Sequence, residues 1–561
     1  MKPETFFDNF EALAEAPNGV QKLRELILQL AVRGKLVAQD KKDEPASTLI
    51  KNITAEKERL VKEKKINNAR AFPTIDENKI PYNLPKAWEW VRLGDLCHDW
   101  GQKKPDVEFT YIDVSAIDKE HGIISDNIQI LKPNDAPSRA RKIVSKGTVI
   151  YATVRPYLLN IAIVDKEIEP EPIVSTAFAV LHPLSGVLNR YLYYYLRSKP
   201  FIAFVESEMT GMAYPAINDG KLYLGLVPLP PSNEQHRIVA KVDQLMSLCD
   251  ELEARQQKKR ESRAHINSAA LDRMIAARAP GEFAEGWRRI RDNFDLIYDS
   301  PENVGALRQT IIQLAVMGKL VAQDEKDEPA EILMEKIKVE RMRLVKEKKI
   351  KKIDPLPIIE AGEEPYSLPL GWKWVRFGDL GQTQTGTTPS KNNPEFFGKD
   401  YPFLKPGDIS NNFIDYNNEG LTHLGIETGR LIKSGSILMV CIGGSIGKVN
   451  CVDRECSCNQ QINVLTPFLN LDCKLFTYFL RSRYFQNEVI MRAPKTTLPI
   501  LSKGKWELIP FPLPSSKEQA RIVARVDQLM ALCDKLEAGL LRSQADSEKL
   551  MEAVVGRMLA E

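Results

Sequence analysis

The chain is a duplication, and this feature constrains its fold more than any other. Residues 8–277 and 292–561 are two copies of one unit, aligned at a constant offset of 284 positions over most of their length. The segment LPKAWEWVRLGDL at Leu84, for example, returns as LPLGWKWVRFGDL at Leu368. The closely matching parts, which we call the frame, surround two inserts at 97–228 and 381–512 that keep only scattered identities. Near-identical frames around divergent inserts indicate one scaffold that presents two different recognition surfaces.

Length and composition place the chain among multidomain globular proteins. Its 561 residues exceed what one hydrophobic core normally serves. With 43% hydrophobic and 27% charged residues, it has no apolar run near the roughly 18 residues of a membrane span. The first residues lack the basic and apolar regions of a secretory signal, so we expect a cytoplasmic protein. Eight cysteines without regular spacing predict reduced thiols rather than a disulfide framework.

Each frame opens with two predicted helices. Apolar residues recur at helical spacing from Leu23 to Leu30, and Gly34 is expected to end this first helix. A charged helix follows from Pro45 to about Lys65, and its end, LVKEKKI, recurs unchanged at 344–350. Such a charged run is typical of a solvated helix face, but it also suits a docking or phosphate-contacting surface. The polar segments 67–83 and 351–367, which contain proline, are interpreted as linkers.

Each copy closes with a long predicted helix. Ser232 and Ser516 each stand three residues before a glutamine, which is the capping-box pattern, so the helices should begin near 233 and 517. We expect them to run to about 278 and 559. Apolar residues at alternating spacings of four and three predict a coiled-coil seam, in which the two long helices pack against each other. The seam residues are Ile238, Val242, Leu245, Cys249 and Leu252 in the first helix, and Ile522, Val526, Leu529, Cys533, Leu536 and Leu540 in the second. The alternative is that both are surface helices packed onto the inserts.

The inserts are predicted to be mixed α/β. Short segments rich in β-branched residues, such as those from Gly147 and Gly435, read as strands. The loops from Pro133 and Thr383 combine hydroxyls, amides and cations, as surfaces that contact phosphates and base edges do, although a solvated loop has a similar composition. Four tryptophans could stack on bases, but their repeated place in the frame predicts core anchors: Trp88, Trp90, Trp372 and Trp374.

The sequence offers no complete catalytic motif. GGSIGKV at Gly443 has too few residues between its glycines for a phosphate loop, and Val449 stands where a metal-binding hydroxyl should be. The Asn/Asp-Pro-Pro-aromatic motif of an amino-methyltransferase is missing, and His236 becomes Ala520 in the second copy. The cysteines between 441 and 473 match no zinc pattern. We therefore predict no catalytic, cofactor-binding or metal-binding residue in this chain.

Several motifs together resemble one family. The W-x-W-V-R-L-G-D-L segment, the GTTPS loop at Gly386, the PFLKPGDIS stretch, the GGSIGKV turn and the PLPPSNEQHRIV segment are similar to the specificity subunit of type I restriction-modification systems. The resemblance covers essentially the whole chain. Its most specific element is the doubled order of frame, variable domain and long helix.

The resemblance implies an α+β fold, a tandem pseudo-repeat of two mixed α/β target recognition domains separated by two long antiparallel coiled-coil helices. The expected ranges are 1–83 for a helical frame and linker, 84–231 for the first recognition domain, 232–280 for the central helix, 281–367 for the repeated frame and linker, 368–515 for the second recognition domain and 516–561 for the final helix.

In function, the resemblance implies a bacterial or archaeal DNA-binding subunit. Each domain would read one half of a bipartite, asymmetric site in double-stranded DNA, and the helices would set the spacer. Two methyltransferase subunits and two restriction subunits would join the chain, with no membrane involved. These partners would bind S-adenosylmethionine, ATP and magnesium, because they would carry out the catalytic reactions.

Residue-level expectations differ between the inserts, because Tyr157 aligns with Ser445 and Asn160 with Lys448. The DNA-binding candidates are Arg139, Arg141, Arg155, Tyr157 and Asn160 in the first insert, and Thr387, Thr388, Ser390, Lys391, Ser445 and Lys448 in the second. Two other functions remain as alternatives. A self-contained modification enzyme should carry a cofactor motif, and a coiled-coil interaction scaffold without DNA specificity does not explain why the inserts diverge.

Overall fold

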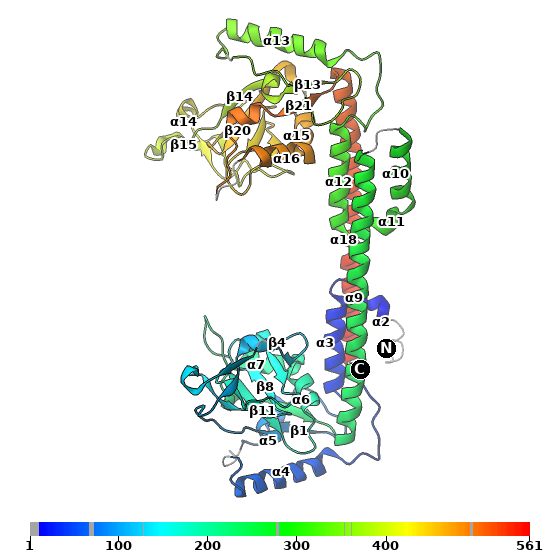
Figure 1. Cartoon of the computed structure of the whole chain (residues 1–561), viewed down its shortest axis with the longest axis vertical. Coiled ribbons are helices and arrows are strands. Elements are labelled where there is room, and N and C mark those ends of the chain that lie inside the picture. The colour runs from blue at the N-terminus through cyan, green and yellow to red at the C-terminus, as the bar shows by residue number, and fades with distance from the viewer. Residues whose placement is uncertain are drawn as a thin grey trace. The chain divides into compact units, whose positions relative to one another are not determined.

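The computed structural model describes residues 10–66, 72–126, 128–276, 280–352, 354–360, 362–493 and 498–560, and Figure 1 shows their helices and strands. The chain divides into two compact units. Unit 1 comprises residues 1–259 and 544–561, and unit 2 comprises residues 260–543. Each unit therefore contains one recognition insert with its own frame, together with the last part of the long helix that belongs to the other repeat.

The expected helices of the frame are present. Those of unit 1 are α2 (Phe10–Ala14), α3 (Gly19–Val32) and α4 (Ala46–Lys62). Those of unit 2 are α10 (Pro280–Asp292), α11 (Phe294–Ile297), α12 (Pro301–Val316) and α13 (Ala330–Lys346). The apolar positions from Leu23 to Leu30 are buried, and Gly34 follows α3 with a φ of 68°. A side chain at Gly34 would meet the ring of Pro85 at 2.5 Å, so this turn requires glycine.

The long helices are α9 (Ser232–Ala276) and α18 (Ser516–Ala560), each of 45 residues. The predicted end near 278 lies outside the described residues. The predicted capping box was wrong in its bonds, because the side-chain amide of Gln235 donates to the carbonyl of Pro230 at 3.1 Å rather than reaching back to residue 232. Gln519 does the same with Pro514 at 3.0 Å. These glutamines thus anchor the proline turn before each helix.

The predicted seam residues of α9 are buried, and so are Ile522, Val526 and Cys533 of α18, whereas Leu529, Leu536 and Leu540 are half-buried. Three helices share each seam. In unit 1, Ile238, Val242 and Cys249 pack in one core with α3 and with Met551 and Met558 at the end of α18. In unit 2, Ile522 and Val526 pack with α12, and Leu536 packs against a cluster that contains Leu271 and Met274 near the end of α9. The first half of each long helix therefore packs with the last part of the other, as an antiparallel pair requires. The prediction that the two seams pack against each other was wrong. The seam of α9 lies in the core of unit 1 and the seam of α18 in the core of unit 2, where α3 and α12 cover them.

Ion pairs hold these three-helix clusters in the same way in both units. Arg24 of α3 donates to Glu253 of α9 at 2.8 Å, and Arg308 of α12 donates to Glu537 of α18 at 2.8 Å. Both arginines are largely buried, whereas their carboxylate partners are more exposed. The repeated pairs fix the rotation of the short helix against the long one.

The insert of unit 1 is built on two four-stranded sheets. Their orders are β2-β11-β8-β9 and β6-β3-β10-β7. The strands are β2 (Cys97–His98), β3 (Phe109–Ile112), β6 (Gln129–Leu131), β7 (Ala140–Ile143), β8 (Val149–Ala152), β9 (Ile161–Ile163), β10 (Pro172–Ser175) and β11 (Phe178–Pro183). A small pair, β4 (Ile117–Asp118) and β5 (Ile123–Ile124), and the helices α5 (Leu93–Leu96), α6 (Asn189–Leu196), α7 (Lys199–Glu208) and α8 (Asp219–Leu222) complete it.

Unit 2 repeats the first of these sheets in the order β14-β20-β17-β18, beside a three-stranded sheet β16-β15-β19. Its strands are β14 (Gly381–Thr385), β15 (Phe397–Leu404), β16 (Gly420–Leu421), β17 (Ile437–Val440), β18 (Val449–Cys451), β19 (Ser457–Cys458) and β20 (Ile462–Pro467). Its helices are α14 (His423–Thr428), α15 (Cys473–Arg481), α16 (Arg483–Arg492) and α17 (Lys503–Glu507). The strands predicted from Gly147 and Gly435 are confirmed as β8 and β17.

Each insert begins and ends in one two-stranded ribbon. In unit 1, β1 (Glu89–Arg92) pairs antiparallel with β12 (Leu226–Leu229), and in unit 2, β13 (Lys373–Arg376) pairs with β21 (Pro510–Leu513). The chain therefore enters and leaves each insert at the same place. This geometry makes the insert a module whose two chain connections to the frame lie side by side.

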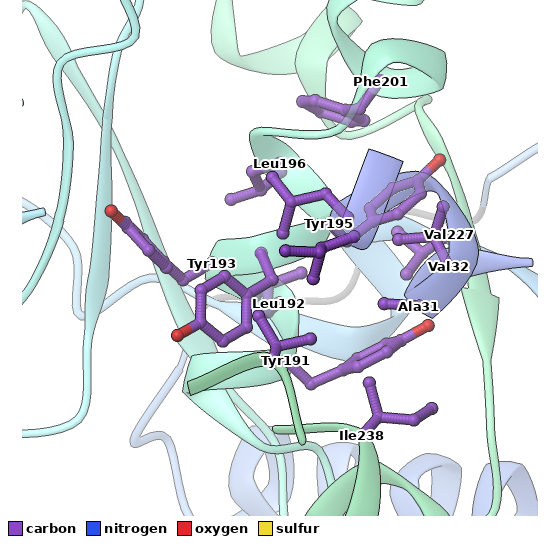
Figure 2. Packing of buried hydrophobic residues seen from close by; sticks show 14 of the residues in the cluster. Ala31, Val32, Tyr191, Leu192, Tyr193, Tyr195, Leu196, Phe201, Val227 and Ile238 are labelled. Carbon is purple, nitrogen blue, oxygen red and sulfur yellow. The ribbon is translucent and has the colours of Figure 1, made fainter. Parts of the chain in front are cut away.

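Helix α6 joins the insert of unit 1 to the frame (Figure 2). Its Tyr191 lies close to Ile238 of α9, and Tyr195 lies near Val32 of α3 and Val227 of β12. The Tyr191 hydroxyl donates to the Pro228 carbonyl at 2.5 Å, so this buried polar group is satisfied. A tyrosine-rich helix thus packs against both the frame and the ribbon.

The cysteine prediction was wrong for one pair. Cys451 of β18 and Cys473 of α15 form a disulfide across 22 residues of sequence. Six other cysteines are free and buried, so they behave as small apolar residues. No pattern of spacing marks this pair in the sequence, because only the fold brings β18 to the start of α15.

Of the four tryptophans predicted to be core anchors, Trp88, Trp372 and Trp374 are buried and Trp90 is half-buried. Two of the four bind a buried carboxylate. Trp88 donates to Glu234 of α9 at 3.0 Å, and the Gln39 amide donates to the other carboxylate oxygen at 2.5 Å. Trp372 and Gln323 hold Glu518 in the same way, at 2.8 and 2.7 Å. Burial raises the pKa of Glu234 and of Glu518 despite these donors. Each carboxylate therefore depends on its two donors to remain charged inside the protein.

Replacing Trp88 by Phe should destabilise unit 1 by about 1–3 kcal/mol at neutral pH, because the buried Glu234 carboxylate loses a donor. The pKa of Glu234 is raised in the folded protein, so above this pKa the charged carboxylate lowers the free energy of unfolding. As the pH falls through this pKa, the carboxylate is protonated and the loss of stability becomes smaller. The destabilisation should therefore shrink in mildly acidic buffer. Denaturant unfolding at both pH values measures it. Trp90→Phe is the control, since Trp90 donates only to the backbone carbonyl of Tyr82, at 3.3 Å; equal losses in both variants would contradict the role of Glu234.

Candidate nucleic-acid interface

In each insert, the loops gather at one end of the repeated four-stranded sheet. In unit 2, Thr385 pairs with Asn463 and Val440 pairs with Ile462. The end of β14, the start of β20, the end of β17 and the start of β18 therefore lie together. We call this end, with the loops 386–391, 441–448 and 459–461, the loop end of unit 2.

The first group of candidates lies at this loop end. The backbone N–H of Thr387 donates to the Cys458 carbonyl at 2.9 Å, and the Thr388 hydroxyl donates to the side-chain carbonyl of Gln460 at 2.6 Å. Ser390 and Lys391 follow and are exposed. A side chain at Gly386 would meet the Asn459 carbonyl at 2.2 Å, so the close approach of the two loops requires glycine there.

The second group of candidates lies on the tight turn between β17 and β18. Gly443 and Gly447 have φ values of 92° and 91°, which permit the turn that carries Ser445 and Lys448. The Gln486 amide donates to the Gly447 carbonyl at 2.9 Å and fixes the turn from α16. The backbone N–H of Cys441 donates to the Gln461 carbonyl at 2.8 Å, so this turn and the 459–461 loop are neighbours. The fold thus brings both groups of second-insert candidates to one end of one sheet.

The first insert places its candidates similarly, with one difference. Arg155, Tyr157 and Asn160 lie on the loop between β8 and β9, where Arg155 has a φ of 50°. The backbone carbonyl of Arg139 accepts from Thr176 at 2.8 Å, which places Arg139 at the turn between β10 and β11. We call this region the loop end of unit 1. Arg141 is the exception, because it lies within β7 and its guanidinium donates to the Ala140 carbonyl at 3.1 Å.

Two parts of the loop ends were not among the sequence candidates. In unit 2, Gln460 is exposed and bonded to Thr388, within the run Asn459-Gln460-Gln461. An amide run between two short strands was a signal that could have been read, because Gln and Asn side chains pair with adenine edges. In unit 1, residues 209–216 lie against the Arg155 loop, where the N–H of Arg155 donates to the Pro215 carbonyl at 2.8 Å. Sequence gave no signal for this contact between distant loops.

Two histidines of unit 1 lie at the opposite end of the sheet. His98 of β2 and His182 of β11 are paired neighbours, with ring centroids 5.0 Å apart, and both rings pack against Trp100. Burial lowers the pKa of His182 to about 4. This imidazole is therefore neutral near pH 7, and its half-buried ring packs against His98 and Trp100.

The chemistry of both loop ends suits recognition. Their side chains are amides, hydroxyls, guanidinium groups and ammonium groups, which bond to phosphate oxygens and to base edges. The two loop ends carry different residues on the same sheet topology. This combination defines a binding protein with two related sites of different specificity.

Comparison with known proteins agrees with this class. Residues 85–261 and 369–543 match the family described as type I restriction modification DNA specificity domain. The chain is 33% identical to the type I restriction enzyme EcoAI specificity subunit of Escherichia coli, over 92% of this chain and 90% of that one. It is 30% identical to the EcoEI specificity subunit of the same species, over 96% and 94%. A solved chain from work on assembly and conformational transition of the type I R-M system matches with a TM-score of 0.54 and 25% identity, over 85% of this chain and 99% of that one.

The chain therefore belongs to the family of type I restriction-modification specificity subunits. It is the DNA-specificity subunit of such a system, with two recognition domains in tandem, and the family resemblance read from its motifs is confirmed. A scaffold without DNA specificity is not favoured. Among the described residues, no helix is long and apolar enough to cross a membrane.

Replacing Gln460 by Ala should relax the choice of base at one position in the half-site of the second domain. A well-placed bidentate amide contributes about 1–3 kcal/mol of discrimination between bases. Methylome sequencing of cells that carry the variant with its partner subunits would show the relaxed position. Asn417→Ala is the control, because Asn417 is an exposed amide near the other sheet of this domain. An unchanged motif in the Gln460 variant would remove this residue from the contact set.

Proposed function

We propose that each recognition domain reads one half of a bipartite, asymmetric DNA site through its loop end, and that α9 and α18 set the spacer between the halves. The observation that supports this most directly is a single sheet topology whose loop ends differ, carried on two nearly identical frames. Nearly identical frames hold the domains in the same way, while different loops present different hydrogen-bonding groups. Two unrelated half-sites are the expected ligand of such a pair.

The proposed contacts are those of the loop ends. In the first domain they are made by Arg139, Arg155, Tyr157 and Asn160, and by Arg141 from within β7. In the second they are made by Thr387, Thr388, Ser390, Lys391, Ser445, Lys448 and Gln460. The cations position the DNA backbone, and the amides and hydroxyls read base edges.

The proposed partners carry the chemistry. Two adenine methyltransferase subunits, using S-adenosylmethionine, and two restriction subunits, using ATP and magnesium, assemble on this chain in a bacterial or archaeal cytoplasm. The division of labour agrees with a sequence that has recognition domains but lacks the amino-methyltransferase motif. The duplicated frame supports two copies of the same partner, one on each repeat.

The frames share an exposed surface that suits such a partner. At the ends of α4 and α13, both repeats expose the same basic residues, which form the shared basic end: Arg59, Lys62, Lys64 and Lys65, and Arg343, Lys346, Lys348 and Lys349. Where the two repeats have the same buried residue, packing explains the match, but packing does not explain a match between exposed residues. Lysines at a helix end are favoured by the helix dipole, but two repeats need not keep the same four cations for that reason. A partner that contacts both repeats alike accounts for them.

Exchanging residues 85–231 for the matching domain of a relative should change one half-site and leave the other half-site and the spacer unchanged. The insert enters and leaves through the β1–β12 ribbon, so the exchange leaves the sequences of α9 and α18 unchanged. Methylome mapping of the chimaera reads all three quantities together. If both halves change, the domains are not independent readers; if the spacer changes, the long helices do not set it.

Reversing charge at Lys62 and Lys64 should reduce the number of bound methyltransferase subunits from two to one, because the shared basic end is altered in the first repeat and unchanged in the second. Native mass spectrometry of the purified complex counts the subunits. Lys51→Glu is the control, since Lys51 is exposed on the same helix but its counterpart is Glu335. If both subunits remain and only salt-sensitive DNA binding weakens, the shared basic end contacts phosphates instead.

A further inference from the structure

A second loop lies against the β8–β9 loop of unit 1. Residues 209–216 follow α7 and return along the β8–β9 loop, with bridge pairing of Val154 and Thr210 to Ala216. The backbone groups of Thr210 and Ala216 exchange two hydrogen bonds of 2.9 Å. The two loops therefore form one surface, although about fifty residues separate them in sequence.

This surface is apolar to an extent that its own packing does not explain. The exposed side chains are Met212 at 103%, Tyr214 at 69%, Tyr157 at 45%, Leu158 at 40% and Val154 at 39%. Soluble proteins seldom gather exposed apolar groups in this way except where they bind something. The Arg155 guanidinium lies over the Tyr214 ring, 4.9 Å from its centroid, so a cation is fixed inside the patch.

The identity of the ligand follows from the comparison of the two repeats. In unit 2, Leu498 stands in place of Tyr214, and the Gly443–Lys448 turn stands in place of the Arg155 loop. A protein partner common to both repeats would need similar surfaces on both. This surface lies instead in the divergent insert, at the loop end, beside a fixed cation. A DNA half-site is the ligand that differs between the repeats and carries negative charge.

We propose that Met212 and Tyr214 form a wedge that enters the DNA between two base pairs of the first half-site. Apolar side chains, methionine among them, partly unstack base steps when they insert, and a bent duplex then contacts more protein. Arg155 holds the Tyr214 ring at the surface and pairs with a nearby phosphate. The first domain thereby favours half-sites that contain an easily unstacked pyrimidine–purine step, a preference read as DNA deformability rather than hydrogen bonding. This proposal rests on the family function and specifies how one domain carries it out.

The test uses the complete complex of this chain with its methyltransferase subunits. Methylome mapping first defines the site, and duplexes of that site then carry 2-aminopurine at successive positions of the first half. Binding should raise the fluorescence at one step, because unstacking relieves quenching of the probe. In the Met212→Ala/Tyr214→Ala double variant the rise should vanish, and affinity for the site should fall between about fivefold and a hundredfold. Affinity for unrelated duplex should change by less than about twofold, since phosphate contacts supply it.

Two variants serve as controls. Ile130→Ala removes a side chain that is 57% exposed on β6 of the same insert, and Leu498→Ala alters the corresponding position of the second domain. Both should leave the first half-site signal unchanged. A complex that binds its site specifically without any rise in fluorescence overturns the wedge. Loss of methyltransferase subunits from the double variant also overturns it, because the patch would then dock protein. If the unaltered complex shows no preference for its site, the family function itself has failed rather than the wedge.

Discussion

The buried carboxylate at the start of each long helix is the interaction on which the rest of the structure depends. Glu234 joins Gln39 of the opening frame segment, Trp88 before the insert and the first turn of α9. Glu518 repeats this junction with its own glutamine and tryptophan. A charged group inside the protein is stable only while its donors are in place, so these three parts of the chain must come together in one way. The ribbon that carries the insert is thereby fixed to the helix.

Packing of the repeated sheet explains how the loop ends can differ while the frames do not. In unit 1, Val149 and Tyr151 of β8 face the large core shared with the frame, whereas Ile150 and Ala152 face a smaller core within the insert. Both faces of the sheet are thus covered, and its side chains are constrained. The side chains of the loops at the end of the sheet do not fill these cores, so they can change without loss of core packing. Specificity and stability therefore lie on different residues of the same domain.

The two repeats are not independent folding units, although the sequence divides into two copies. Met551 and Met558 belong to the second repeat, yet they complete the core that contains Ile238 and Cys249 of the first. Leu271 and Met274 likewise lie in the unit built around the second insert. Each unit thus contains the end of a long helix that belongs to the other repeat. The last turns of each long helix are buried against residues of the other repeat and not of their own.

The sequence alone determined the features that depend on local pattern or on repetition. Helical spacing identified α3, α9 and α18, β-branched runs identified β8 and β17, and the recurrence of Trp88 and Trp372 identified core anchors. Tertiary structure decided which of these parts meet. In the folded protein, the seam of α9 packs against α3 and the end of α18, and Cys451 pairs with Cys473. Gln460 and residues 209–216 lie beside the loops that are expected to read DNA. Such contacts join residues far apart in the chain, and their selection depends on the burial of surfaces that no local spacing encodes.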